Sequence, residues 1–139
     1  MEEEGRKELV YLILYSANWL DANLRDLLKP HHITVQQYQV LKLIHDSEEL
    51  VNHTHLKRNV VEKDADISRL VGRLAQLNLI NKSAVKGDKR QHRLRLSKKG
   101  QDLMEQLSLI PERVDQLFDH LDASEKEQLV YLLSKTHSS

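Results

Sequence analysis

The sequence contains no cysteine, only four glycines and two prolines, and few aromatic residues. The absence of cysteine excludes disulfide scaffolds, thiolate chemistry and cysteine-based zinc sites. The scarcity of glycine and proline, set against 25 leucines, predicts long helices with few breaks. No apolar run approaches the ~18 residues of a membrane span. Residues 1–4 are acidic where a secretory signal would be basic, which predicts a cytoplasmic protein.

Length and composition predict one globular domain without catalytic machinery. The chain has 139 residues, of which 40% are hydrophobic and 30% charged, and a chain of this size buries roughly two-thirds of its unfolded surface. The sequence has no glycine-rich phosphate loop, no Gly-x-Ser-x-Gly elbow and no His-Glu-x-x-His motif. We therefore expect neither an enzyme nor a cofactor-binding protein.

The formal net charge is zero, but the charges are unevenly distributed. Between Leu56 and Gly100 there are 13 basic and 4 acidic residues, whereas the rest of the chain holds 8 basic and 17 acidic ones. The basic residues are densest from Lys82 to Lys99. Such asymmetry is typical of a surface that meets a polyanion.

The first helix is expected from about Glu4 to Leu28, because the residue before Pro30 disfavours helical geometry. Its segment at residues 9–15 is apolar on all sides. A helix without a polar face must be covered on more than one side. In a chain of this size, the pattern indicates a partner subunit.

Two shorter helices are expected next. Thr34 and Gln37 form a capping box that opens a helix running to about His45. After a polar loop, His55 to Val61 are expected to form a third helix. The side chains predicted to face inward are Tyr38, Leu41 and Ile44 in the first of these helices, and Leu56 and Val60 in the second.

The clearest helical pattern follows a turn at residues 62–64. Apolar residues recur there at three- and four-residue spacing, which predicts one buried stripe; they are Ile67, Leu70, Val71, Leu74 and Leu77. The opposite face carries Asp66, Ser68, Arg69, Gly72, Arg73 and Gln76. Asn78 can end this helix in a left-handed conformation.

A basic hairpin is expected after this helix. Leu79 to Val85 and Gln91 to Ser97 are typical of two strands, joined by a loop at residues 86–90. In the second strand Leu94 and its alternate neighbours would face one way and the arginines between them the other. Ser97 is expected to cap a further helix.

The C-terminal region carries a heptad seam of apolar residues, Leu103, Leu107, Ile110, Val114, Leu117 and Leu121. The seam keeps its phase across Pro111, which predicts one kinked helix or two nearly collinear ones. Ser124 is expected to open a second capping box and a terminal helix. Leu129, Leu132 and Leu133 are expected to face inward in that helix.

The order of helix, turn, amphipathic helix with a basic outer face and basic hairpin is that of a winged helix-turn-helix. The predicted fold class is therefore mainly α with a small β-hairpin wing, flanked by N- and C-terminal dimerisation helices. A helix fills the major groove of duplex DNA, and a hairpin with a basic tip can reach the adjacent minor groove. Flanking lysines and arginines suit the phosphates.

Two blocks of the sequence resemble the MarR family of bacterial transcription regulators. Leu56–Val60, Ile67–Leu74 and Asn78–Ile80 are similar to the family's ungapped helix-turn-helix pattern. Asp88-Lys89-Arg90 followed by Leu96–Gly100 is similar to its wing signature, Asp-x-Arg and then Leu-Thr/Ser-x-x-Gly. The spacing between the blocks also fits without insertion.

The resemblance implies a single MarR-like domain over residues 1–139, with dimerisation helices at 1–30 and 101–139 and a winged DNA-binding lobe at 31–100. It implies a homodimer, more often a repressor than an activator, on a pseudo-palindromic operator. Two-fold symmetry would place the recognition helices about 34 Å apart. The residues expected at the dimer interface are Leu9, Leu12, Ile13, Leu117, Leu121, Leu129 and Leu132.

Four residues of the recognition helix are candidates for DNA contacts. Arg69 would donate to guanine or phosphate, Ser68 to phosphate, and Arg73, one turn further, to phosphate. Asp66 could accept from a cytosine amino group, or could instead cap the helix. The family pattern usually has small hydroxyl residues where Ala65 and Asp66 stand, which indicates an unusual operator.

In the wing, Arg90 is the candidate for the minor groove, and Lys86 and Lys89 are candidates for phosphate contacts. Asp88 is expected to order the wing by pairing with a nearby arginine or with loop N–H groups.

Histidine and aromatic residues offer two further hypotheses. His31-His32 and His53-Thr54-His55 invite a metal site, but no two of these histidines are spaced i and i+4, so surface histidines without metal are expected. Trp19, Tyr15 and Tyr38 would line a cleft where members of the family often bind small aromatic effectors, or would belong to the core.

Two other functions remain as alternatives. One is a winged-helix protein-interaction module without DNA binding, favoured by the acidic Asp64 and Asp66. The other is a metal-responsive sensor that uses the histidine cluster.

Overall fold

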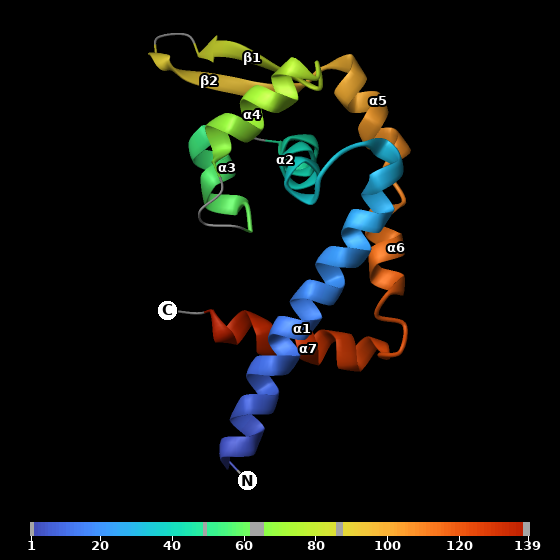
Figure 1. Ribbon diagram of the computed structural model, residues 1–139. Coiled ribbons are helices and arrows are strands. Elements are labelled where there is room, and N and C mark those ends of the chain that lie inside the picture. Colours follow the sequence, from blue (N-terminus) through green and yellow to red (C-terminus); the bar gives the residue numbers. More distant parts are fainter. Residues whose placement is uncertain (1, 49, 62–65, 86–87, 138–139) are drawn as a thin grey trace. The chain divides into compact units, whose positions relative to one another are not determined.

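The computed structural model describes residues 2–48, 50–61, 66–85 and 88–137 (Figure 1). The chain divides into two compact units, Met1–Leu107 and Ser108–Ser139, which are described separately. The first contains α1 (Glu2–Leu28), a 3-10 turn η1 (Lys29–His31), α2 (Val35–Asp46), α3 (His53–Asn59), α4 (Ile67–Gln76), β1 (Ile80–Val85), β2 (Asp88–Leu96) and α5 (Lys98–Gln106). The second contains α6 (Ile110–Gln116) and α7 (Ala123–Thr136). In the described part of the chain, no helix is long and apolar enough to span a bilayer.

Helix α1 ends at Leu28, as predicted, and begins two residues earlier than expected. Pro30 lies in the first turn of η1, where a missing N–H costs nothing. His32 then adopts a left-handed conformation with φ of 58° and ends the turn. The break after α1 is therefore local in origin.

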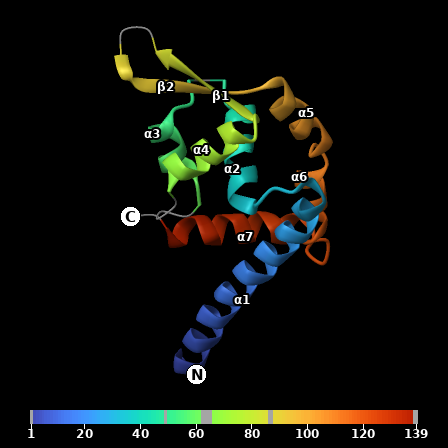
Figure 2. The ribbon, with the colours of Figure 1, turned by 45° about the horizontal axis from the view of Figure 1, so that its top comes forward.

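Helix α2 forms the centre of the first unit. The predicted capping box is confirmed: Thr34 Oγ1 accepts from the Gln37 amide at 3.1 Å, and Gln37 Oε1 accepts from the Thr34 amide at 3.0 Å. The helix contacts α1, α3, α4, α5 and β2, and Figure 2 shows it between α4 and α5. Its buried residues are Tyr38, Val40, Leu41 and Ile44, which include the three that were predicted.

Helices α3 and α4 pack on each other and on α2. Helix α3 begins at His53 rather than at His55, because the Asn52 side chain accepts from the His55 amide at 2.8 Å and caps it. Leu56 and Val60 are buried, as predicted. The predicted turn at residues 62–64 lies outside the described residues.

Strands β1 and β2 form an antiparallel hairpin in which Ile80 pairs with Leu96 and Lys82 with Leu94. The prediction of a loop up to residue 90 was wrong, because β2 begins at Asp88, which pairs with Val85 across an irregularity in the register. The buried Leu94 faces the core, and its amide donates to the Val51 carbonyl at 2.8 Å. The hairpin is thus tied to the loop before α3.

The heptad seam does not run along one helix. Helix α5 ends at Gln106, and α6 restarts at Ile110 with Pro111 in its first turn, which is the position that a helix tolerates for proline. The predicted alternative of one kinked helix was therefore wrong. Leu117 and Leu121 lie beyond the end of α6 and are half-buried.

In the second unit, the predicted cap of α7 at Ser124 was wrong. The cap is Asp122, whose carboxylate accepts from the Glu125 amide at 2.8 Å, while the Glu125 carboxylate accepts from the Asp122 amide at 3.0 Å. Lys126 Nζ lies 3.3 Å from Asp115 Oδ2 and links α7 to α6. The prediction of inward leucines was also wrong, since no residue of α7 is buried.

Candidate nucleic-acid interface

Helix α4 separates into a buried and an exposed face. Ile67, Val71 and Leu74 are buried, whereas Ser68, Arg69 and Arg73 are exposed. Three of the four predicted contact residues therefore lie on the solvent face of this helix, whose other face packs in the core. Leu70 and Leu77, which were predicted for the buried stripe, are half-buried at its margins.

Asp66 caps the N-terminus of α4. Its Oδ1 accepts from the Arg69 amide at 3.0 Å, and its backbone carbonyl accepts from the Leu70 amide at 3.0 Å. The capping role that the sequence left open for Asp66 is thus present in the structure. A carboxylate at this end of a helix also complements the helix dipole.

The hairpin packs next to α4 (Figure 1) and carries further basic residues. Lys82 on β1 and Arg95 on β2 are exposed, and Arg93 is half-buried. Among the predicted wing residues, Lys86 lies outside the described residues. Asp88, Lys89 and Arg90 belong to β2, but their side chains lie outside the described part of the chain.

Some exposed basic residues were missed by the sequence argument. Lys57 and Arg58 occupy the last turn of α3, which packs against α4, and both are exposed. Arg95 was assigned only to a strand face. The signal that would have found Lys57 and Arg58 is their position in the first helix of the helix-turn-helix, which crosses the DNA backbone in this class of motif.

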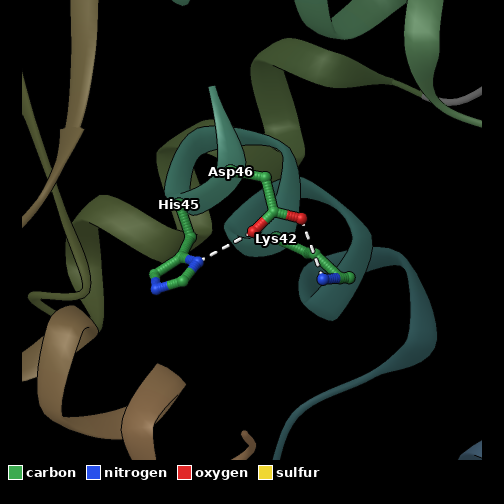
Figure 3. A network of polar contacts seen from close by, with 3 residues as sticks. All are labelled: Lys42, His45 and Asp46. Atoms are coloured by element: carbon green, nitrogen blue, oxygen red, sulfur yellow. Dashed lines mark hydrogen bonds and ion pairs between the residues drawn. The ribbon is translucent and has the colours of Figure 1, made fainter. Parts of the chain in front are cut away.

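A small polar network lies at the end of α2. Lys42 Nζ is 2.8 Å from Asp46 Oδ2, and His45 Nδ1 is 2.9 Å from Asp46 Oδ1 (Figure 3). The hydrogen bond from Lys42, followed by that from His45, lowers the pKa of the Asp46 carboxyl, and the same hydrogen bond raises the pKa of Lys42. The network is solvated, with about half of the Asp46 side chain exposed.

Of the three aromatic residues predicted to line a cleft, Tyr38 lies at a cavity of the first unit. Tyr38 is buried, which raises the pKa of its phenol, and it lines a cavity of about 460 Å³ together with Lys42, His55 and Val61. Tyr15 and Trp19 do not line this cavity. Tyr15 is exposed and stacks on Tyr11, with 5.7 Å between the ring centroids. Tyr38 is therefore placed at a cavity, as the effector hypothesis requires of it.

The histidines do not form a metal cluster in the described ranges. No group of three or more histidine, aspartate or glutamate side chains in these ranges is arranged to hold a metal ion. His31 and His32 line a cavity of about 430 Å³ next to Lys99 and Asp102.

Five of the seven residues predicted for dimerisation are exposed, whereas Leu117 and Leu121 are half-buried. In α1, Leu9, Leu12 and Ile13 are 60%, 48% and 44% exposed, and in α7, Leu129 and Leu132 are 37% and 58% exposed. Large apolar side chains are normally the most buried in a protein. Exposed apolar side chains that gather on one helix, as at residues 9–15 of α1, are typical of interaction sites.

No family model matches the sequence, and neither does any curated protein. Solved structures do match. A cysteine-to-serine variant of MarR from E. coli, complexed with operator DNA, is 27% identical, with 94% of each chain covered and a TM-score of 0.84. MepR from S. aureus, in a complex with DNA, is 21% identical over 91% of this chain and 94% of that one, with a TM-score of 0.83. BpsR from Bordetella bronchiseptica, whose DNA binding is regulated by 6-hydroxynicotinic acid, is 22% identical over 93% and 92%, with a TM-score of 0.82.

The fold and the exposed basic face of α4 define this chain as a winged helix-turn-helix protein, which confirms the predicted fold class. The similarity to E. coli MarR extends over nearly the whole of both chains. The chain therefore resembles the MarR family of transcription regulators in its overall fold as well as in its two sequence motifs.

Proposed function

We propose that this protein is a sequence-specific, double-stranded DNA-binding transcription regulator that acts as a homodimeric repressor on a pseudo-palindromic operator. The observation that carries the proposal is the exposed face of α4, where Ser68, Arg69 and Arg73 stand on a helix anchored by a buried stripe, beside a basic hairpin. Two similar structures, MarR from E. coli and MepR from S. aureus, are DNA complexes. The protein would bind DNA in the cytoplasm and would not act as an enzyme.

Within this proposal, α4 enters the major groove. Ser68 and Arg69, in the first turn of the helix, reach base edges and the adjacent phosphates, while Arg73 contacts phosphate. Asp66 adds an acceptor for a cytosine amino group beside its capping role. In the wing, Arg90 enters the minor groove, Lys86 and Lys89 contact phosphates, and Asp88 orders the hairpin.

The proposed domain plan assigns residues 31–100 to the DNA-binding lobe and residues 1–30 and 101–139 to dimerisation. The exposed apolar residues of α1 and α7 support a partner copy, because leaving them in water costs free energy that burial recovers. Leu9, Leu12, Ile13, Leu117, Leu121, Leu129 and Leu132 would pack across the two-fold axis.

A small aromatic effector would release the DNA. Support comes from BpsR, whose DNA binding is regulated by 6-hydroxynicotinic acid, and from Tyr38 at a cavity between α2 and α3 in this chain. An effector acts by binding the DNA-free conformation better than the DNA-bound one.

Selection of duplexes from a random pool, followed by a salt titration, tests the proposal. We expect enrichment of a palindromic site and a steep fall of affinity with salt, because Lys and Arg displace counterions from phosphates. A flat salt dependence, or no binding at low salt, would overturn DNA binding and favour a protein-interaction module.

Two substitutions test the residue roles. Arg69→Ala should alter site preference by about 1–3 kcal/mol, whereas Arg90→Ala should weaken binding to most sequences and lower the salt slope by about one. Lys7→Ala, which removes a positive charge from α1 instead, is the control. Affinities equal to that of the parent for both variants would contradict both assignments.

A further inference from the structure

The C-terminal end of α4 is held by residues from a distant part of the chain. The last carbonyls of a helix have no partner within it. Lys99 Nζ donates to the Leu77 carbonyl at 3.1 Å, and Ser97 Oγ donates to the Asn78 carbonyl. Both donors lie at the start of α5, on the far side of the hairpin in sequence.

Backbone atoms also join the segment after α4 to the start of α5. The Ser97 amide donates to the Leu79 carbonyl at 3.0 Å. A Cβ atom on Gly100 would lie 2.1 Å from that carbonyl oxygen, so only glycine fits there. Three consecutive carbonyls, those of residues 77–79, thus meet Ser97, Lys99 and Gly100. We call these contacts the α4–α5 clamp.

Ser97 serves two helices at once. Its hydroxyl oxygen accepts a hydrogen bond from the Gly100 amide at 3.0 Å and so caps the N-terminus of α5. The same hydroxyl donates a hydrogen bond to the carbonyl of Asn78, which follows α4. Asn78, with φ of 60°, turns the chain so that this carbonyl faces the donor. The ammonium of Lys99 complements the negative end of the α4 dipole. The end of one helix and the start of the other are therefore set by the same atoms.

We infer that Ser97 and Lys99 are positioning residues that fix the direction of α4 relative to α5. Lys99 lies in the basic stretch at residues 82–99, yet its contact is within the protein rather than with phosphate. The inference rests on the proposed function of α4 as the DNA-reading helix. Base edges demand a fixed helix position, whereas phosphate contacts carry no sequence information. Loss of the clamp therefore reduces discrimination between sequences more than it reduces overall affinity.

The adjacent Lys98 provides a matched control. It is exposed in the same turn of α5 and carries the same charge, and within the described residues it has no hydrogen bond or ion pair. Fluorescence anisotropy would compare Lys99→Met and Lys98→Met on two probes: a duplex selected by the parent chain from a random pool, and a random-sequence duplex of equal length.

The readout is the ratio of the two affinities, because loss of one charge affects both probes alike. We expect Lys99→Met to lower the ratio about threefold to tenfold, the range for loss of one hydrogen bond. Lys98→Met should leave it unchanged, and Lys99→Arg, which keeps a charged donor, should restore it. Equal ratios for Lys99→Met and Lys98→Met would overturn the inference.

Hydrogen exchange of the Ser97 and Leu79 amides tests the clamp without DNA. Exchange should be faster in Lys99→Met than in Lys98→Met. Faster exchange with an unchanged affinity ratio would make the clamp a matter of stability alone and would overturn the inference. Failure of the parent chain to bind either duplex would instead overturn the proposed function, whereas the exchange result would still report on the clamp.

Discussion

Helices α1 and α2 are both rich in apolar residues, yet the chain covers only one of them. Leu41 of α2 is fully buried, because α2 is surrounded by four helices and a strand. Leu12 of α1 is 48% exposed, and all of residues 9–15 are at least 44% exposed. The winged lobe thus completes its own core, while α1 presents apolar surface that this chain leaves uncovered. Polar groups differ in a similar way: some have hydrogen-bond partners within the chain, and others are proposed to contact DNA.

The largest expected effect is on the covered side of this comparison. Leu41→Ala should lower the free energy of unfolding by about 2–5 kcal/mol, because it leaves a cavity in a closely packed core. Urea denaturation at low protein concentration measures this loss. Leu12→Ala should cost far less under the same conditions, and equal losses for the two variants would remove the distinction.

On the uncovered side, Leu12→Asp should weaken self-association by about 2–3 kcal/mol, or roughly 100-fold in the dissociation constant, because an interface would bury an unpaired charge. Sedimentation over a range of concentrations gives this constant. Ala22→Asp places the same charge on the same helix outside residues 9–15 and serves as the control. A parent chain that sediments as a 16.2 kDa monomer at all concentrations would contradict the proposed dimer.

Substitutions of Asp66 test whether this polar residue of the candidate DNA interface stabilises the chain through its hydrogen bond to the Arg69 amide. Asp66→Ala should destabilise the protein by about 1 kcal/mol, because the Arg69 amide loses its acceptor. Asp66→Asn keeps a capping oxygen and should remain within a few tenths of a kcal/mol of the parent. Thermal melting of the two variants measures the difference, and an equal loss in both would show that the charge matters rather than the cap.

The smallest effect is expected in the solvated network of α2. Asp46→Asn should cost about 0.5 kcal/mol or less at neutral pH, because both partners are more than a third exposed. The folded-state pKa of Asp46 is lowered, so its contribution is present above the ordinary pKa of 3.8 and is lost as pH falls through the lower folded value. Melting curves of parent and variant should therefore converge in acid. A difference that persists at the lowest pH would contradict this origin.

Local patterns predicted local structure well. The Thr34 capping box and the apolar stripe of α4 depend on residues a few positions apart, and both are confirmed. The left-handed Asn78 is confirmed for the same reason. Two errors arose where neighbouring residues compete for one role. Asp122 caps α7 in place of Ser124, and α3, capped by Asn52, begins two residues before the predicted start.

Other features could not be predicted because their partners are distant in sequence. The start of β2 depends on pairing across the hairpin, which the alternation in one strand does not specify. The role of Lys99 was hidden for a similar reason. In the sequence it is one of several basic residues, and only the folded chain places its ammonium at the Leu77 carbonyl.

The sequence by itself determined the class of this protein, because the order of its amphipathic and basic segments and the spacing of its two motifs are visible in the amino-acid sequence alone. It also determined that its zero net charge conceals a basic middle and an acidic remainder. Only the tertiary structure decided which apolar residues are covered, that Asp66 caps α4, and that the end of α4 is held from α5. Burial and the contacts at the end of α4 depend on residues far apart in the sequence, and the capping role depends on which of several near neighbours forms the hydrogen bond. Neither is fixed until the chain has folded.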